Sequence, residues 1–194
     1  MKLRGYTSHV RKSWLPILFL VGFLGVANAQ EYEIHPYAGA FFPEKFLNLI
    51  TVQNKAIYGL KAGIYVTGNF EAEANYGFIN NLSFENTLTK TKAHIWEGSA
   101  SYHVGGTPRF YGTVGFGGVT TNVSDDSQTL FGPNTSATEM FFSVSYGGGI
   151  KLLRMFGPVG FRADVRGRTL PRYYGFRFSW LETTAGLSFS FGER

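Results

Sequence analysis

Apolar and polar residues alternate one by one along much of the chain, and this period of two is the feature that most limits the fold. In the segment 70–78 the even positions carry aromatic residues and alanine, whereas the odd positions carry Glu71, Glu73, Asn75 and Gly77. A pleated strand sends successive side chains to opposite faces, so such a segment predicts a strand with one apolar and one polar face. No segment of helical length after residue 30 shows a convincing period of 3.6. We therefore expect an all-β protein.

The alternation recurs in seven segments, and an eighth has a less regular pattern. The seven are 56–66, 70–78, 94–104, 110–119, 140–152, 159–168 and 181–191, and the eighth is 32–43. Tight turns rich in Gly and Pro at 67–69, 105–108 and 156–158 alternate with long connections at about 44–55, 79–91, 123–138 and 170–179. Strands of ~9–11 residues suffice to cross a bilayer at a tilt. Short turns at one end and long loops at the other predict an eight-stranded antiparallel up-and-down transmembrane β-barrel.

The two faces of these strands differ in charge, and the difference indicates which face points inward. The polar face carries nine charged residues: Lys61, Glu71, Glu73, Glu97, Lys151, Arg162, Asp164, Arg166 and Glu182. An eight-stranded barrel has an interior just wide enough for side chains. Opposite charges can pair there, with small Gly, Ser and Thr residues making room for them, so we expect a lumen charge network and a polar, plugged lumen. A periplasmic, lipocalin-like binding barrel, with the faces reversed, is the alternative fold.

The N-terminus has the features of an export signal. Basic residues precede an apolar run at 14–26, which ends in Ala27-Asn28-Ala29. This run is shorter than the roughly 20 residues of a transmembrane helix, so we predict a signal peptide over 1–29 and a mature barrel domain over 30–194. The same segment holds four of the 18 Lys and Arg residues, which leaves 14 against 13 acids. No basic patch remains to indicate nucleic acid as a partner.

Two segments of the predicted barrel resemble small outer-membrane barrels of the OmpA/OmpX type. The last strand contains Gly186, Phe189 and Phe191 in the spacing of the C-terminal signal that the barrel-assembly machinery recognises. The segment 161–166 contains Arg162-Ala163-Asp164-Val165-Arg166, similar to an Arg-x-Asp-x-Arg pattern of that group. The resemblance implies a Gram-negative outer membrane, assembly by that machinery, and contact with outer-membrane lipid and lipopolysaccharide.

Catalytic and metal sites are not expected. The chain has no Cys, which excludes thiol catalysis and Cys-ligated metals. A nucleophilic Ser needs a His within hydrogen-bond reach. His94 is followed two residues later by Trp96 rather than Ser, and we interpret Ser101 and His103 as lumen packing. We predict a protein that is not an enzyme and has no cofactor.

The segment 170–180 is the most suggestive surface of the predicted barrel, because it interleaves arginines with aromatic residues. Arg172, Tyr173, Tyr174 and Arg177 form a candidate surface-binding loop, since guanidinium groups pair with phosphate and aromatic rings supply contact area. Extension of the barrel wall at the headgroup layer is the plainer interpretation. The sequence thus predicts a structural or surface-interaction role with an unknown surface ligand, and a narrow channel for ions or small solutes is the alternative function.

Overall fold

The computed structural model describes residues 31–44, 53–82, 91–123 and 138–192. This part of the chain forms β1 (Tyr32–Pro43), β2 (Lys55–Tyr65), β3 (Phe70–Leu82), β4 (Thr91–Val104), β5 (Arg109–Val123), β6 (Thr138–Phe156), β7 (Val159–Tyr173) and β8 (Phe176–Phe191). It holds no helix long and apolar enough to cross a bilayer. The predicted signal peptide, 1–29, lies outside the described residues.

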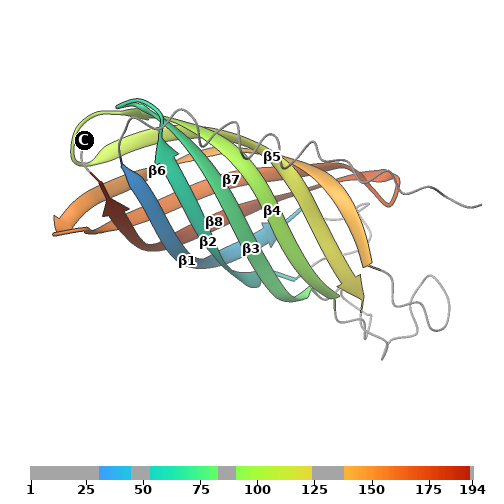
Figure 1. Ribbon diagram of the computed structural model, residues 1–194. Helices are drawn as coiled ribbons and strands as arrows, with labels where there is room; N and C mark the ends of the chain where they lie inside the picture. Colours follow the sequence, from blue (N-terminus) through green and yellow to red (C-terminus); the bar gives the residue numbers. More distant parts are fainter. Residues whose placement is uncertain (1–30, 45–52, 83–90, 124–137, 193–194) are drawn as a thin grey trace, which may run out of the picture.

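Every strand pairs antiparallel with the next, and β1 pairs with β8 to close the barrel (Figure 1). At this seam Tyr32 lies opposite Phe191 at one end, and Pro43 lies opposite Trp180 at the other. The predicted eight-stranded antiparallel up-and-down barrel is confirmed.

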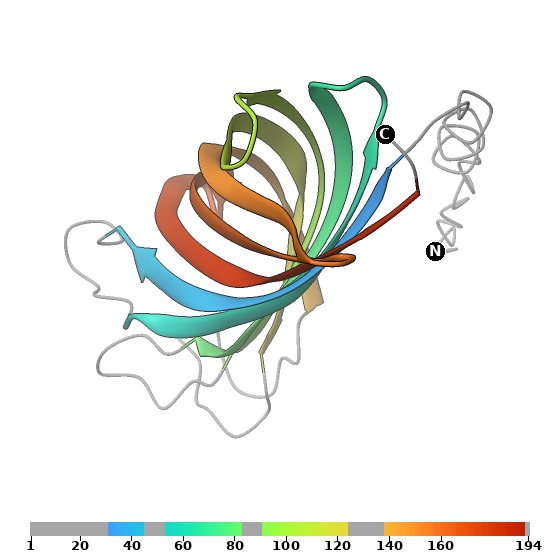
Figure 2. The ribbon, with the colours of Figure 1, turned by 90° about the vertical axis from the view of Figure 1, so that its left-hand side faces the viewer.

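The two ends of the barrel differ in their connections. At the first, the turn end, short connections at 66–69, 105–108 and 157–158 lie beside the start of β1 and the end of β8; Figure 2 views the barrel from this side. At the second, the loop end, longer connections join β1 to β2, β3 to β4 and β5 to β6. Most of those connections lie outside the described residues.

The fourth long connection, predicted at about 170–179, is wrong. β7 continues to Tyr173 and β8 begins at Phe176, so only two residues separate them. Both have positive φ, 47° at Tyr174 and 89° at Gly175, as in the tight turns that suit a twisted hairpin. The strands stay paired here, and Pro171 lies in a register shift between Leu170 and Tyr173. This hairpin was not predicted from the sequence because Pro171 and aromatic residues on both faces interrupt the alternation of polar and apolar residues.

The side chains alternate in the predicted directions. Outward side chains are apolar and exposed, such as Phe116 (67%), Phe142 (61%) and Tyr146 (62%). The irregular first strand follows the same rule, because Tyr32 and Ile34 are exposed while Glu33 and His35 are buried. The barrel therefore has an apolar outer wall and an interior rich in charge.

Candidate functional site

The lumen is filled by charged side chains that reach inward from most of the wall. All nine residues proposed as a lumen charge network are inside the barrel and at most 5% exposed: Lys61, Glu71, Glu73, Glu97, Lys151, Arg162, Asp164, Arg166 and Glu182. Glycine makes room for some of them, since a Cβ on Gly63 would overlap the carboxylate of Glu71.

Two arginines of β7 cross the half of the lumen nearer the loop end. Arg166 donates to Glu73 on β3 and Glu97 on β4, each at 2.7 Å. Arg168 donates to Glu97 at 2.5 Å and to Glu182 on β8 at 2.8 Å. The bonds to Glu73 and Glu97 connect β7 across the lumen to β3 and β4, whereas Glu182 lies on the neighbouring strand β8.

A second group of ion pairs lies toward the turn end. Lys151 on β6 donates to Glu33 at 2.7 Å and to Glu71 at 2.8 Å. Arg162 donates to Glu73 at 2.5 Å and has a nitrogen 3.5 Å from Glu33. Buried charges of opposite sign thus face each other without a layer of water between them, an arrangement that offsets the cost of removing each from water.

Asp164 forms ion pairs with two cations, Lys61 and Arg162. Lys61 on β2 donates to it at 2.6 Å, and the Arg162 guanidinium lies 3.2 Å from its other oxygen. His35 lies beside this group, with Nε2 3.8 Å from Asp164 and Nδ1 2.9 Å from the carbonyl oxygen of Leu187.

The sequence interpretation missed three members of the network. Arg168 continues the alternation of 162, 164 and 166, and that spacing could have identified it. Glu33 lies on the strand whose faces were not assigned. His103 was interpreted as packing, and its Nε2 lies 3.0 Å from Glu71.

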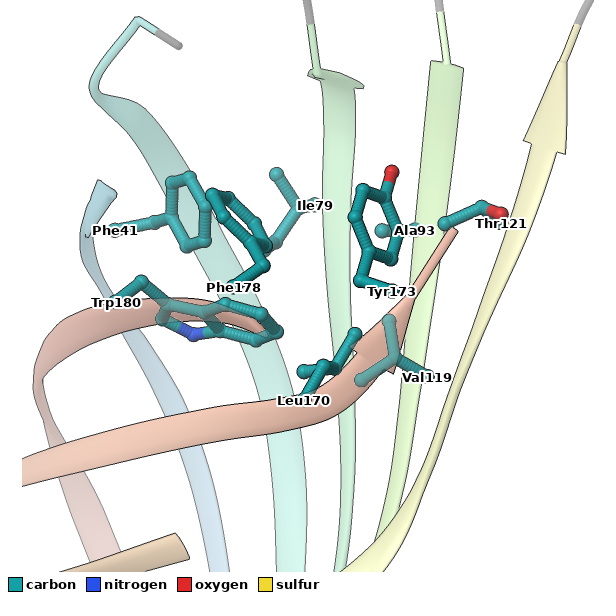
Figure 3. A pocket seen from close by; sticks show the side chains of 9 residues that line it. All are labelled: Phe41, Ile79, Ala93, Val119, Thr121, Leu170, Tyr173, Phe178 and Trp180. Atoms are coloured by element: carbon teal, nitrogen blue, oxygen red, sulfur yellow. The ribbon is translucent and has the colours of Figure 1, made fainter. Parts of the chain in front are cut away.

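Near the loop end the interior changes from charged to apolar. We call this layer the apolar cap; its buried residues are at most 6% exposed and are Tyr37, Phe41, Ile57, Ile79, Ala93, Ile95, Val119, Leu170, Tyr173, Phe178 and Trp180. Figure 3 shows most of them converging on a small pocket, with Thr121 at its edge. The cap is joined to the charges below it, because Trp180 Nε1 donates to Glu182 at 2.6 Å and Tyr37 donates to Asn75 at 3.0 Å.

At this end the interior therefore differs from the expected polar, plugged lumen, because the side chains that fill it are apolar. Ile57 and Ile79 lie opposite each other on inward positions of β2 and β3, Ala93 lies opposite Ile79 on β4, and Ile95 is the next inward residue of β4. The sequence signal for this layer was isoleucine at positions where the alternation predicts a polar residue, toward the loop end of three strands.

The four residues of the candidate surface-binding loop lie on the β7–β8 hairpin and separate into two pairs. Arg172 and Arg177 are exposed beside the paired residues Tyr173 and Phe176. Tyr173 instead points into the apolar cap, and Tyr174 packs against Tyr173 and Phe141. Of the four, the two arginines are the most exposed to a ligand from outside, and Tyr174 is half-buried.

The histidines considered for catalysis have other partners. His94 lies on the outer wall, where its Nδ1 is 2.8 Å from the Tyr76 hydroxyl. Ser101 donates to Thr113 at 3.0 Å, whereas His103 bonds to Glu71. The proposed assembly signal lies on β8, where Gly186 pairs with both neighbouring strands and Phe191 is exposed on the outer wall.

Comparison with known proteins supports the fold. No protein-family model matches the chain, and no curated protein sequence matches it. Neisserial surface protein A matches with a TM-score of 0.60 at 14% identity, covering 83% of this chain and 97% of that one. The N-terminal β-barrel domain of Pseudomonas aeruginosa OprF matches with a TM-score of 0.53 at 17% identity, covering 83% and 97%.

A third solved structure has a bound molecule. It is Ail, the attachment invasion locus protein of Yersinia pestis, in complex with the heparin analogue sucrose octasulfate. It matches with a TM-score of 0.50 at 16% identity, covering 82% of this chain and 100% of that one. The resemblance to small OmpA/OmpX-type barrels is thus confirmed as a resemblance of fold.

Proposed function

We propose that the chain is an integral outer-membrane β-barrel of a Gram-negative envelope, with a structural and surface-interaction role. The observation that carries the proposal is the distribution of side chains over the closed wall, with paired charges inside and exposed apolar residues outside. An apolar surface of this extent is an aggregation hazard in water and is expected in lipid. In such a barrel the turn end faces the periplasm and the loop end faces the cell exterior.

The first test is the migration of the mature chain on a gel, with and without boiling, after folding in detergent. A closed membrane barrel resists SDS at room temperature and migrates as a compact species until it is heated. We expect this shift. A chain that is soluble without detergent and migrates identically in both lanes would contradict the proposal and favour the lipocalin-like alternative.

A narrow channel is the weaker candidate, because two different layers obstruct the lumen. The ion pairs of Arg162 with Glu73 and of Arg166 and Arg168 with Glu97 cross it, and the apolar cap lies over them. Planar bilayers with the folded barrel are expected to show no defined single-channel steps. Reproducible steps, absent from a preparation without protein, would restore the channel hypothesis.

We further propose that the β7–β8 hairpin binds the phosphate groups of lipopolysaccharide through Arg172 and Arg177. The two arginines flank the paired residues Tyr173 and Phe176, so like charges lie on neighbouring strands. Such a pair is unfavourable alone, and a shared anion removes the repulsion. The complex of Ail with a sulfated ligand is consistent with anion binding by this fold.

This proposal is tested by titrating the barrel with lipopolysaccharide and with the same material after removal of its phosphates. Wild type should prefer the phosphorylated form, and Arg172→Gln combined with Arg177→Gln should abolish the preference. Arg109→Gln, which removes an arginine at the opposite end, is the matched control. An unchanged preference in the double variant would refute this role.

Two other expectations follow from the same proposal. We infer that the assembly machinery recognises β8 through Gly186, Phe189 and Phe191 during biogenesis. We infer no catalytic activity, because His94 and His103 bond to Tyr76 and Glu71 rather than to a serine.

A further inference from the structure

The outer wall has an apolar groove at the turn end, where β6, β7 and β8 meet. Its volume is about 290 Å³. The side chains that line it are Leu152, Met155, Phe156, Val159, Phe161 and Leu187. The groove is distinct from the lumen, because Phe156, Phe161 and Leu187 are exposed on the outside of the barrel.

A bulge in β6 creates this groove. Leu152 lies opposite Phe161, and the next pair along the hairpin is Phe156 with Val159. Three residues of β6 therefore face the single residue Gly160 on β7, so the bulged strand bends away from its partner. The rest of the β6–β7 pairing, from Val144 with Thr169 to Leu152 with Phe161, stays in regular register, so this irregularity of the pair is local to the turn end.

The bulge also holds a cation beside the groove. Arg154, next to the groove residue Met155, has φ of 53°. Its Nη2 donates to the carbonyl oxygen of Gly192 at 2.6 Å, and its Nε lies 3.5 Å from Glu31. These contacts fix the guanidinium at the rim of the barrel while 44% of the side chain stays exposed. Arg154 therefore belongs to the same bulge as the groove residues Leu152 and Met155, and its partly exposed guanidinium, which is paired with Glu31, lies at the same end of the barrel as the groove.

We propose that this groove is a binding site for a glycerophospholipid, with an acyl chain in the groove and the phosphate at Arg154. The inference rests on the proposed outer-membrane location, which places the turn end in the periplasmic leaflet, where glycerophospholipids make up the bilayer. Charge complementarity selects this occupant, because an uncharged apolar partner makes no use of the arginine and an arginine pairs well with phosphate. The site would hold one lipid more firmly than the rest of the outer wall does.

Native mass spectrometry of the folded barrel, released from detergent after incubation with phosphatidylglycerol, tests the proposal. Diacylglycerol with the same acyl chains serves as the ligand without phosphate. Wild type should retain one phosphatidylglycerol, and Arg154→Gln should retain about tenfold less, the scale of one lost charge-assisted contact. The matched control Lys92→Gln, which removes an exposed cation of β4 at the opposite end of the barrel, should retain lipid like wild type.

Filling the groove provides the second arm. Leu187→Trp, and the milder Leu187→Phe, should reduce retention of both lipids, whereas Leu181→Trp on the same face of β8 should not. Equal retention in all variants, or no retained lipid in wild type, would overturn the inference. The heat shift on gels distinguishes failure of the lipid site from failure of the proposed outer-membrane location. A variant that shifts is a folded membrane barrel, so loss of lipid specificity then refutes the lipid site alone, whereas a wild type that does not shift refutes the proposed location.

Discussion

Replacement of Arg162 by Met tests whether the lumen charges stabilise the barrel. The side chain is buried, and it contacts three carboxylates, those of Glu33, Glu73 and Asp164. Methionine replaces the aliphatic stem of the arginine and carries no charge, so the variant removes the cation and keeps an unbranched side chain in the lumen. Loss of one partner from a buried ion pair costs about 3–5 kcal/mol, because the remaining charge is left in a dry site.

The contacts of the three carboxylates place the expected loss at the lower end of that range. Each keeps a second cation within bonding distance: Arg166 for Glu73, at 2.7 Å; Lys61 for Asp164, at 2.6 Å; and Lys151 for Glu33, at 2.7 Å. We therefore expect a reduction of about 3 kcal/mol in the free energy of unfolding. The second change Glu73→Gln should recover part of this loss, since it removes one of the acids that the first change leaves in excess.

The assay is equilibrium unfolding by urea in phospholipid vesicles, followed by tryptophan fluorescence and checked by the heat shift on gels. Arg172→Met, which changes an exposed arginine on the same strand, is the control and should unfold like wild type. A change of less than about 1 kcal/mol for Arg162→Met, the size of an ordinary substitution, would refute the argument that the network stabilises the fold. So would a double variant that is less stable by the full sum of the two single changes.

Three further changes test other parts of the barrel. A Cβ at Gly115 would lie 2.8 Å from Glu97 Cδ, whereas one at Gly112 meets nothing within 4 Å, so Gly115→Ala should lower the unfolding midpoint and Gly112→Ala should leave it unchanged. Trp180→Ala should cost about 3–5 kcal/mol in urea unfolding, because it empties part of the apolar cap. Phe191→Ser should reduce the amount of heat-shifted barrel in cell membranes without changing unfolding in vesicles; unaltered amounts in cells would argue against its role in the assembly signal.

The sequence was sufficient for the fold because every strand of the wall has one face toward the lumen and one toward the outside, and these two environments differ in polarity. Residues such as Glu71 and Glu73 could therefore be assigned to the lumen from spacing alone. The partners of each charge could not be assigned. Arg166 reaches Glu73 and Glu97 across the lumen, and a contact between strands so far apart in the chain depends on the closed barrel rather than on local spacing.

The apolar cap and the last hairpin escaped the sequence interpretation for a common reason. Alternation identifies the inward face only while that face is polar, and at Ile79, Leu170 and Phe178 the inward residues are apolar. The segment around Pro171 then resembles a loop in composition, although its backbone stays paired. Hydrogen bonding between β7 and β8, which composition does not reveal, decided that structure.

The two layers of the lumen have complementary effects on the barrel. A slip of one residue in the register of β7 would turn Arg162, Arg166 and Arg168 toward the lipid, so the ion pairs specify the register of the strand as well as stabilising it. The cap lies between these pairs and the loop end, and it limits the access of water from that side. Ion pairs are stronger where water is excluded, and a wall braced in this way forms a rigid base for the β7–β8 hairpin. We therefore expect changes in the cap, such as Trp180→Ala, to weaken the effect of Arg162→Met, because water that enters the lumen screens the excess negative charge that the loss of Arg162 leaves there.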